Sequence, residues 1–524
     1  MIRLASILFV MLLLPLNAMA VEINDQGAQK LKTSFENILA YQKEVNEAFG
    51  SVRVIYEGEI TVKQESEYYT ITLPRILLKS PIITPAEEGD EKSKDEDQTF
   101  DMGIISINAM PDDQAGHWKT TWTLPETMTM SGEADTDFSI RWGKQNIIAL
   151  LDDTLGYFTK MNLNLSNVSF NIEQEDIGVS IGNLQFYINL DKNDAGTFSG
   201  PAYALISDLF IAPEEENSTI KIGELKIGST MTEFSLPTLT EYKAKLMKHA
   251  GIFQSLTNIE NEDDAKDVNG QDVMDMILDL YDIDMNGFNI EYSLKNLEIN
   301  SAPEDENKNF DTLKLGSAFM GFGFNNLNTE KGELNIKTGY DTIDIQSENP
   351  EHISLDFLPA HTNFDIKVEN IPYETLSEIA KNSVASLTRN PDSAQMVGMS
   401  LLMKLPAILS QANTKLVIKD NNIKNDIYDI SLNGQAVTNL TAIMGFSAKF
   451  NVIFQGLDAL LSRIPRDTEN TDTTGIIKQL EKLKYLGKAS TGSNRGISYS
   501  FEFEATPQGA FLLNGQDTST IDFD

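Results

Sequence analysis

Four residues in the middle of the chain have types and spacing that could bind a metal ion. Asp282, Asp284, Asn286 and Gly287 match the opening of a calcium-binding loop, in which oxygen ligands alternate and a glycine allows a sharp turn. The twelfth position of such a loop needs a bidentate glutamate, but Ser293 stands there, and the residues after the glycine alternate like a strand. A Ca2+ site at Asp282, Asp284 and Asn286 therefore stays an alternative, and no other cofactor is predicted.

The same stretch also fits a β-hairpin whose two-residue turn is Asn286-Gly287, a favoured pair for a type I′ turn. Each cross-strand apolar pair in such a hairpin contributes roughly 0.2–1 kcal/mol. This register places three apolar pairs on one face: Met285 with Phe288, Ile283 with Ile290, and Tyr281 with Tyr292. The sequence thus favours an acidic hairpin over a metal site.

A second motif that could do chemistry is GVSIG (Gly178–Gly182), which matches the pattern around the nucleophile of α/β-hydrolases. That nucleophile sits on a sharp turn between a strand and a helix, whereas strand-like alternation here continues through Ser180. Ser180 is therefore interpreted as an ordinary strand residue. The chain has four histidines, and none lies in a recognisable motif: His117, His249, His352 and His361.

The composition argues against several classes of protein. The chain has 78 acidic and 41 basic residues, a formal net charge of −37 at pH 7, and no cysteine. Such a charge repels nucleic acid at long range, so no nucleic-acid partner is expected. Without cysteine there is no thiolate zinc site or thiol redox chemistry, and no phosphate-binding glycine loop or HExxH motif occurs.

The N-terminal residues 1–20 have the pattern of a cleaved signal peptide. Arg3 precedes an apolar run from Leu4 to Leu16, and Ala18-Met19-Ala20 offers the small residues that a signal peptidase accepts. The run is shorter than the roughly 20 apolar residues that span a bilayer. We therefore expect an exported, soluble protein of the periplasm, with no transmembrane segment after cleavage.

Elsewhere the dominant pattern has period two, which predicts antiparallel strands with one buried and one wet face. The clearest strand-like runs are Val52–Val62, Tyr68–Leu78, Val168–Leu190, Ile220–Gly228 and Gly332–Ile345. Helical pattern is confined to six segments: Gln26–Phe49, Leu239–Ile259, Gln271–Leu280, Tyr373–Leu387, Ala394–Gln411 and Gly475–Leu486. The predicted fold is a β-rich α+β fold, with extended antiparallel sheets, curved or flat, and inserted helices.

Two structural units are predicted, a β-rich N-terminal unit at 21–260 that opens with a helix and a C-terminal unit at 270–524. The polar stretch Glu260–Asn269 has the composition of a linker. An internal repeat is suggested by the match of LYDIDMNGFNI (Leu280–Ile290) with IYDISLNGQAV (Ile427–Val437), in which Tyr-Asp-Ile and Asn-Gly fall in register.

Two groups of large apolar residues have both a packing and a binding interpretation. Trp118 and Trp122 fall on one face of a predicted strand, where core packing is favoured over a ligand platform. The segment Met396–Met403 is rich in methionine and is predicted to pack in the core, with a cover over an acyl chain as the alternative.

Two motifs carry a resemblance to known proteins. ISYSFEFEATPQGAFLLNGQD (Ile497–Asp517) reads as strand, turn and strand, and FDIKVENIPYETL (Phe364–Leu376) passes from a strand into a helix. With these motifs the chain resembles the YdgA-like group of exported β-rich envelope proteins of Gram-negative bacteria, whose function is largely undefined. A looser likeness to AsmA-like proteins implies long curved sheets that suggest a groove for lipid. AsmA-like proteins keep an N-terminal membrane anchor, whereas residues 1–20 look cleavable here, and the resemblance implies no catalytic residues.

From these patterns we expect a non-enzymatic periplasmic protein of the cell envelope that binds a protein partner or an apolar, lipid-like ligand. Many one-sided amphipathic strands and the lack of a catalytic constellation support this expectation. Two alternatives stay open: an envelope hydrolase that acts on glycan or ester, and a structural protein stabilised by Ca2+.

Overall fold

The computed structural model describes residues 23–49, 52–81, 97–113, 116–131, 138–172, 177–213, 218–257, 272–273, 276, 285–301, 310–347, 357–389, 394–464, 471–493 and 495–521. The chain divides into two compact units, unit 1 (Met1–Asp284) and unit 2 (Met285–Asp524). The predicted signal peptide (1–20), the predicted linker (260–269), Asp282, Asp284 and His352 lie outside the described residues. Both units are β-rich and antiparallel with inserted helices, so the predicted fold class is confirmed.

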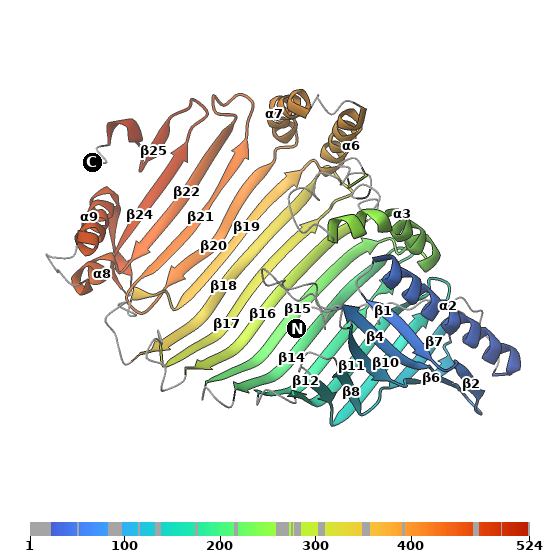
Figure 1. Cartoon of the computed structure of the whole chain (residues 1–524). Helices are drawn as coiled ribbons and strands as arrows, with labels where there is room; N and C mark the ends of the chain where they lie inside the picture. Colours follow the sequence, from blue (N-terminus) through green and yellow to red (C-terminus); the bar gives the residue numbers. More distant parts are fainter. Residues whose placement is uncertain are drawn as a thin grey trace, which may run out of the picture. The chain divides into compact units, whose positions relative to one another are not determined.

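Unit 1 consists of two helices and fifteen strands in its described part (Figure 1). They are α2 (Asp25–Phe49), β1 (Arg53–Glu57), β2 (Thr61–Gln64), β3 (Tyr69–Thr72), β4 (Arg75–Pro81), β5 (Asp97–Gly103), β6 (Ser106–Pro111), β7 (His117–Thr123), β8 (Thr127–Ser131), β9 (Phe138–Arg141), β10 (Lys144–Asp152), β11 (Tyr157–Ile172), β12 (Ile177–Asn189), β13 (Asp191–Lys192), β14 (Phe198–Pro213), β15 (Thr219–Phe234) and α3 (Leu239–Thr257).

The long strand β11 joins two arms of sheet in unit 1. Its first part pairs with β10, which continues through β7, β6 and β3 to β2. Its last part pairs with β9, which continues through β8, β5 and β4 to β1. On the other edge of β11, strands β12, β14 and β15 follow in order.

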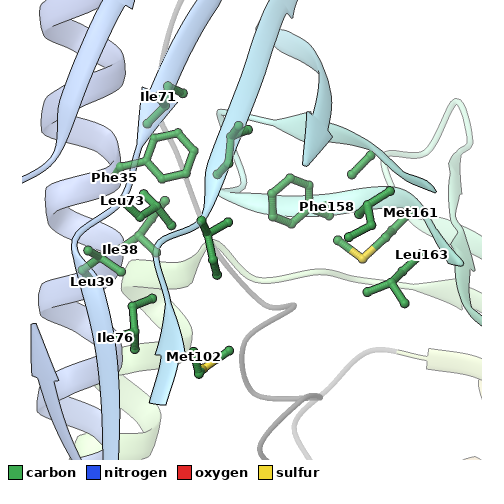
Figure 2. Packing of buried hydrophobic residues seen from close by; sticks show 14 of the residues in the cluster. Phe35, Ile38, Leu39, Ile71, Leu73, Ile76, Met102, Phe158, Met161 and Leu163 are labelled. Carbon is green, nitrogen blue, oxygen red and sulfur yellow. The ribbon is translucent and has the colours of Figure 1, made fainter. Parts of the chain in front are cut away.

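Helix α2 and the two arms bury one hydrophobic core. Asn24 caps the helix, because its Oδ1 accepts a hydrogen bond from the Gly27 N–H at 2.9 Å. Leu31, Phe35 and Ile38 recur at helical spacing and are no more than 1% exposed. Figure 2 shows Phe35 and Ile38 against residues of both arms, with Phe158, Met161 and Leu163 of β11 in the same core.

Unit 2 is a meander of strands with four helices among its described residues (Figure 1). Its elements are β16 (Met285–Asn300), β17 (Thr312–Asn325), β18 (Gly332–Gln346), β19 (His361–Ile371), α6 (Tyr373–Arg389), α7 (Ala394–Gln411), β20 (Lys415–Lys424), β21 (Asp429–Thr438), β22 (Phe446–Gln455), α8 (Leu457–Arg463), α9 (Thr471–Leu486), β23 (Lys488–Ser493), β24 (Gly496–Ala505), β25 (Phe511–Leu513), β26 (Gln516–Asp517) and the 3-10 turn η4 (Thr518–Thr520).

The strands from β16 to β22 pair in chain order, and β22 then pairs with β24. The far edge of β24 is shared by β23 and β25. Helices α8 and α9 follow β22 and precede β23 in the chain. The turn before α8 requires a glycine at position 456, because Gly456 has φ 80° and a Cβ there would lie 2.1 Å from the Ile427 carbonyl oxygen.

Most predicted elements are confirmed, since α2, α3, α6, α7 and α9 match five of the six helical segments within a few residues. The sixth, Gln271–Leu280, lies almost wholly outside the described residues. The predicted turn at Asn286-Gly287 is wrong, because both residues lie inside β16, neither has a positive φ, and Gly287 pairs with Asn325. In the suggested repeat, Asn433-Gly434 likewise lies inside β21.

In the long strands, the alternation of apolar and polar residues shifts by one residue at one position, and the apolar residues on both sides of that position stay on the same face. In unit 1, Asn167 of β11 and Asp208 of β14 adopt φ 54° in mid-strand. Gly182 of β12 lies between them in the ladder, and a Cβ on it would sit 2.9 Å from the Asp208 Cβ. The left-handed residue steps the apolar pattern from i, i+2 to i, i+3, so that Leu165 and Val168 on either side of Asn167 join the same core.

Unit 2 repeats this device with its own residues. Asn296 of β16 has φ 53° and Thr342 of β18 has φ 59°, and Gly316 of β17 lies between them in the ladder. A Cβ at Gly316 would meet the Thr342 Cβ at 2.9 Å and the Asp341 carbonyl oxygen at 3.1 Å. Asparagine tolerates the left-handed region, but a β-branched threonine there is strained.

Candidate apolar binding face

The strongest candidate for a binding surface is one face of the unit 2 sheet. Residues directly paired across neighbouring strands point to the same face of a sheet. One such row crosses eight strands and contains only apolar residues and one glycine: Ile290, Phe322, Ile336, Ile366, Ile418, Gly434, Phe450 and Phe503. We call the face that carries this row the apolar face.

A second row on the apolar face has the same character. It consists of Phe288, Phe324, Leu334, Val368, Leu416, Ala436, Ala448 and Ala505. Seven steps between strands of about 4.8 Å make each row about 34 Å long. The hydrocarbon core of a whole bilayer is about 30 Å thick, so a row is long enough for an extended acyl chain from one leaflet.

The opposite face of the same strands is polar. The adjacent row there consists of Asn289, Gly323, Asn335, Lys367, Val417, Gln435, Lys449 and Glu504. Ion pairs lie on this side, including Lys449 with Glu502 at 3.1 Å and Lys337 with Asp365 at 3.5 Å. The sheet therefore has one polar, solvated face and one hydrophobic face.

The middle of the apolar face is open. Met320 is 54% exposed, Tyr292 42%, Ile336 40% and Phe322 39%. Tyr292 pairs with Met320, and Ile336 pairs with Phe322, so the four side chains form one patch over β16, β17 and β18. Exposed apolar side chains are common singly, but a contiguous patch indicates a binding surface.

One end of the apolar face is covered by helices. Leu457 and Leu460 of α8 pack with Phe454, Tyr499 and Phe501 in a buried cluster, and Leu480 of α9 packs against it. Asp458 fixes α8 to its neighbours, because it accepts a hydrogen bond from the Tyr499 hydroxyl at 3.1 Å and pairs with Lys484 at 2.6 Å. Burial, followed by the hydrogen bond to Asp458, raises the pKa of Tyr499, and the same carboxylate raises the pKa of Lys484.

The candidate metal residues are only partly described. Asn286 lies near the start of β16, on a strand rather than on a loop, and Asp282 and Asp284 lie outside the described residues. Elsewhere in the described ranges, no group of three or more histidine and acidic side chains is gathered closely enough to hold a metal ion. The Ca2+ site therefore stays a prediction.

The candidate nucleophile lies where the sequence predicted it. Ser180 is exposed near the start of β12, paired with Ser169 on one side and Phe210 on the other, so the interpretation as a strand residue is confirmed. His117 at the start of β7 contacts Asp152 at the end of β10 at 3.5 Å, and His361 at the start of β19 contacts Asp341 within β18 at 3.1 Å.

The two tryptophans pack in the core of unit 1, as predicted. Trp118 is 1% exposed and its indole N–H donates to the Asp153 carboxylate at 3.3 Å. Trp122 stacks edge-on against Phe158 with ring centroids 5.4 Å apart. The prediction for Met396–Met403 is wrong, because Met396, Met399, Leu402 and Met403 are between 58% and 77% exposed.

Sequence reasoning found the amphipathic strands but missed the apolar face as a continuous surface. Its rows depend on the register of eight strands that are distant in sequence, and the pattern of one strand does not give that register. The exposure of the α7 methionines was not predicted, because a helix with several apolar residues per turn has the same sequence pattern whether or not another element covers it.

No protein-family model, curated protein or solved structure matches this chain when sequences and folds are compared. The resemblance to YdgA-like and AsmA-like proteins thus stays a prediction. In the described part of the chain, every helix is too short or too polar to cross a bilayer.

Proposed function

We propose that this protein binds an apolar, lipid-like ligand along the apolar face of unit 2, and that it does so in the periplasm without catalysing a reaction. The single observation that carries the proposal is the pair of uninterrupted apolar rows across eight strands whose middle is open to solvent. The signal-like pattern of residues 1–20 supports the location.

The character of the face fits an acyl chain better than a compact polar ligand. The side chains of its open patch are Met, Phe, Ile and Tyr, and apart from the Tyr292 hydroxyl they offer dispersion and burial rather than directed hydrogen bonds. Methionine adapts its shape to different partners, which suits chains of variable length. Polar groups that would orient a sugar or a peptide lie on the opposite face instead.

A fluorescent fatty acid provides the direct test. Wild-type protein should show saturable binding, and the double variant M320Q/I336Q should bind about tenfold more weakly, because two exposed apolar contacts become polar. Lys314→Gln is the matched control, since Lys314 is a half-exposed β17 residue whose side chain pairs with Glu298 at 3.8 Å. Unchanged affinity in M320Q/I336Q, or no saturable binding by folded wild-type protein, would contradict the proposal.

A further inference from the structure

A second exposed apolar surface lies at one end of unit 2, and we call it the apolar tip. It comprises Met396, Met399, Leu402 and Met403 of α7 together with Leu440 and Ile443 of the β21–β22 connection. The α7 residues recur at positions i, i+3, i+6 and i+7, which places them on one stripe of the helix. All six side chains are at least 55% exposed.

Hydrogen bonds hold the parts of the tip together. The Leu440 N–H donates to the Ser410 hydroxyl at the end of α7 at 2.9 Å, and the Thr438 hydroxyl donates to the Leu409 carbonyl at 2.9 Å. The Ile443 N–H donates to the Pro507 carbonyl beyond β24 at 2.9 Å. Figure 1 shows α7 beside the ends of β20 and β21, away from α8 and α9. These bonds fix the C-terminal end of α7, the helix that carries the methionine stripe, to the β21–β22 connection.

The tip differs from the rest of the chain in charge. The chain has 78 acidic residues, but residues 394–411 contain none and only one base, Lys404, and residues 435–448 contain no charge at all. The exposed side chains of the tip are aliphatic or thioether groups without hydrogen-bond donors. A protein interface would be expected to contain Tyr, Trp or Arg anchors and a polar rim.

From this we infer that the apolar tip docks on the hydrocarbon boundary of a lipid bilayer, with a preference for zwitterionic over anionic lipid. Membrane-surface helices that rely on anionic lipid carry several Lys and Arg on their polar face, and α7 carries only Lys404. The net charge of −37 repels an anionic surface, whereas an uncharged tip matches an uncharged one.

The tip is also continuous with the apolar face. Phe446, at the start of β22, alternates with Ala448 and Phe450 and therefore points to the apolar face, while its neighbour Ile443 belongs to the tip. A lipid chain that left the bilayer at the tip would meet Phe446 and its partner Thr438 first, then the second apolar row at Ala448 and the first row at Phe450. In this respect the inference rests on the proposed function, although docking itself does not require it.

Flotation of the full chain with vesicles tests docking. The protein should float with phosphatidylcholine vesicles and should bind more weakly to vesicles that contain phosphatidylglycerol. The double variant M399E/M403E should lose at least tenfold in partitioning, because two apolar side chains that docking would bury in the bilayer are replaced by charges. Tyr485→Glu in α9 is the control, because it places a carboxylate on an 88% exposed apolar residue outside the tip.

A label on the tip gives a second readout that does not depend on how M399E/M403E folds. The chain has no cysteine, so Met403→Cys and Tyr485→Cys each give one site for a polarity-sensitive fluorophore. Phosphatidylcholine vesicles should shift the emission of the label at 403 to the blue and leave the label at 485 unchanged. No shift at 403, or stronger binding to anionic vesicles, would overturn the inference. So would a tip-dependent dimer, seen by light scattering, that does not bind vesicles.

Docking and ligand binding can fail separately. M399E/M403E should keep wild-type affinity for the soluble fluorescent fatty acid, while M320Q/I336Q should keep wild-type flotation. If wild-type protein floats but binds no fatty acid, docking stands and the proposed function fails. If it binds fatty acid but does not float, the docking inference alone is overturned.

Discussion

The two units use apolar strand residues in opposite ways. In unit 1, α2 and two arms of sheet enclose the apolar side chains, so that Phe35 and Ile38 of the helix are 1% exposed and Ile71 of β3 is fully buried. In unit 2, the open patch of the apolar face has the same chemical character, and Met320 of that patch is 54% exposed. Similar strand patterns therefore make a core where a second layer packs on them and, in the described part of unit 2, an open surface where they are exposed.

The difference teaches that the amphipathic strand alone does not decide between packing and binding. What decides is whether another element of the chain supplies the second layer. In unit 1 that element is α2, which begins where Asn24 caps it and where the Tyr69 hydroxyl donates to the Asn24 carbonyl at 3.1 Å. Among the described residues of unit 2, α8 and α9 pack on the end of the apolar face near β24.

The largest expected difference in stability between the two units comes from a substitution in the buried core of unit 1. Phe35→Ala should lower the free energy of unfolding of unit 1 by about 3–5 kcal/mol, because it leaves a cavity between α2 and both arms. Met320→Ala in unit 2 should change stability by about 0.5 kcal/mol or less. Urea unfolding followed by circular dichroism measures both. Equal losses in the two variants would mean that the apolar face is covered like the core.

The next effect concerns the glycine that lets the apolar face continue along β17. Gly316→Ala should destabilise unit 2 by about 1–3 kcal/mol, because its Cβ would meet both Thr342 and the Asp341 backbone. Gly398→Ala in α7 is the control, since a Cβ there meets nothing within 4 Å, and it should be neutral or stabilising by up to about 1 kcal/mol. Thermal unfolding compares the two. If Gly316→Ala were as well tolerated as Gly398→Ala, the shifted alternation would not depend on that glycine.

Particular residues show how far the sequence leads. The strand-to-helix passage within Phe364–Leu376 and the helix predicted at Gln26–Phe49 follow from local patterns, and both are confirmed. The turn predicted at Asn286-Gly287 is wrong because two pairings compete. A local hairpin would form three apolar pairs, whereas the ladder with β17 pairs thirteen residues, and the longer ladder is formed. Pairing between strands that are distant in sequence depends on the whole chain, so the local pattern could not show which of the two pairings is more stable.

The left-handed positions could have been found from sequence. Each long strand contains one place where apolar residues are three apart instead of two, as in Leu165 with Val168 and Leu315 with Ala318. An Asn, Asp, Thr or Gly lies in that gap. The open middle of the apolar face could not be found in this way, because exposure depends on what other segments cover.

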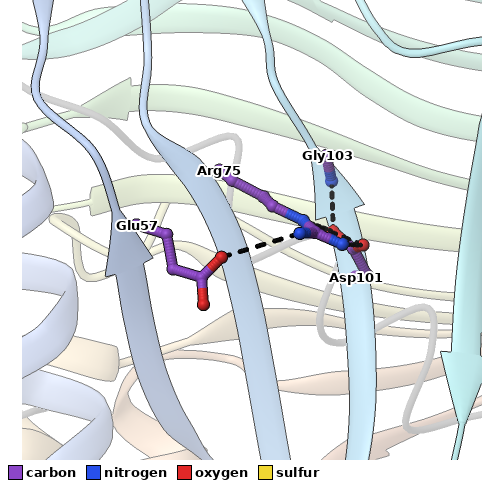
Figure 3. Close-up of polar contacts among 4 residues, drawn as sticks. All are labelled: Glu57, Arg75, Asp101 and Gly103. Carbon is purple, nitrogen blue, oxygen red and sulfur yellow. Dashed lines mark hydrogen bonds and ion pairs between the residues drawn. The ribbon is translucent and has the colours of Figure 1, made fainter.

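The smallest expected effect comes from an exposed ion pair between strands of unit 1. Arg75 of β4 contacts Asp101 of β5 and lies 3.6 Å from Glu57 of β1, and Asp101 also accepts from the Gly103 N–H at 2.8 Å (Figure 3). The hydrogen bond from Arg75 lowers the pKa of Asp101 below its ordinary value. A lowered folded-state pKa stabilises the protein above the unfolded pKa of about 3.9, and this contribution is lost as the pH falls through the folded value.

We therefore expect Asp101→Asn to be slightly less stable than wild-type protein at pH 6 and to approach wild-type stability as the pH falls below 4. Arg75→Gln should give the same profile, because it removes the other partner of the pair. Melting temperatures measured from pH 6 to pH 3 compare the three proteins. A difference that stayed constant over this range would show that the pair does not set the pKa of Asp101.

The central claim is that the open apolar face of unit 2 is a binding surface for an acyl chain. Native mass spectrometry of protein purified without detergent tests it most directly. Wild-type protein and the Lys314→Gln control should carry co-purified lipid, and M320Q/I336Q should carry much less at equal folding by circular dichroism. A folded wild-type protein that arrives free of lipid, and stays free after incubation with fatty acid, would contradict the claim.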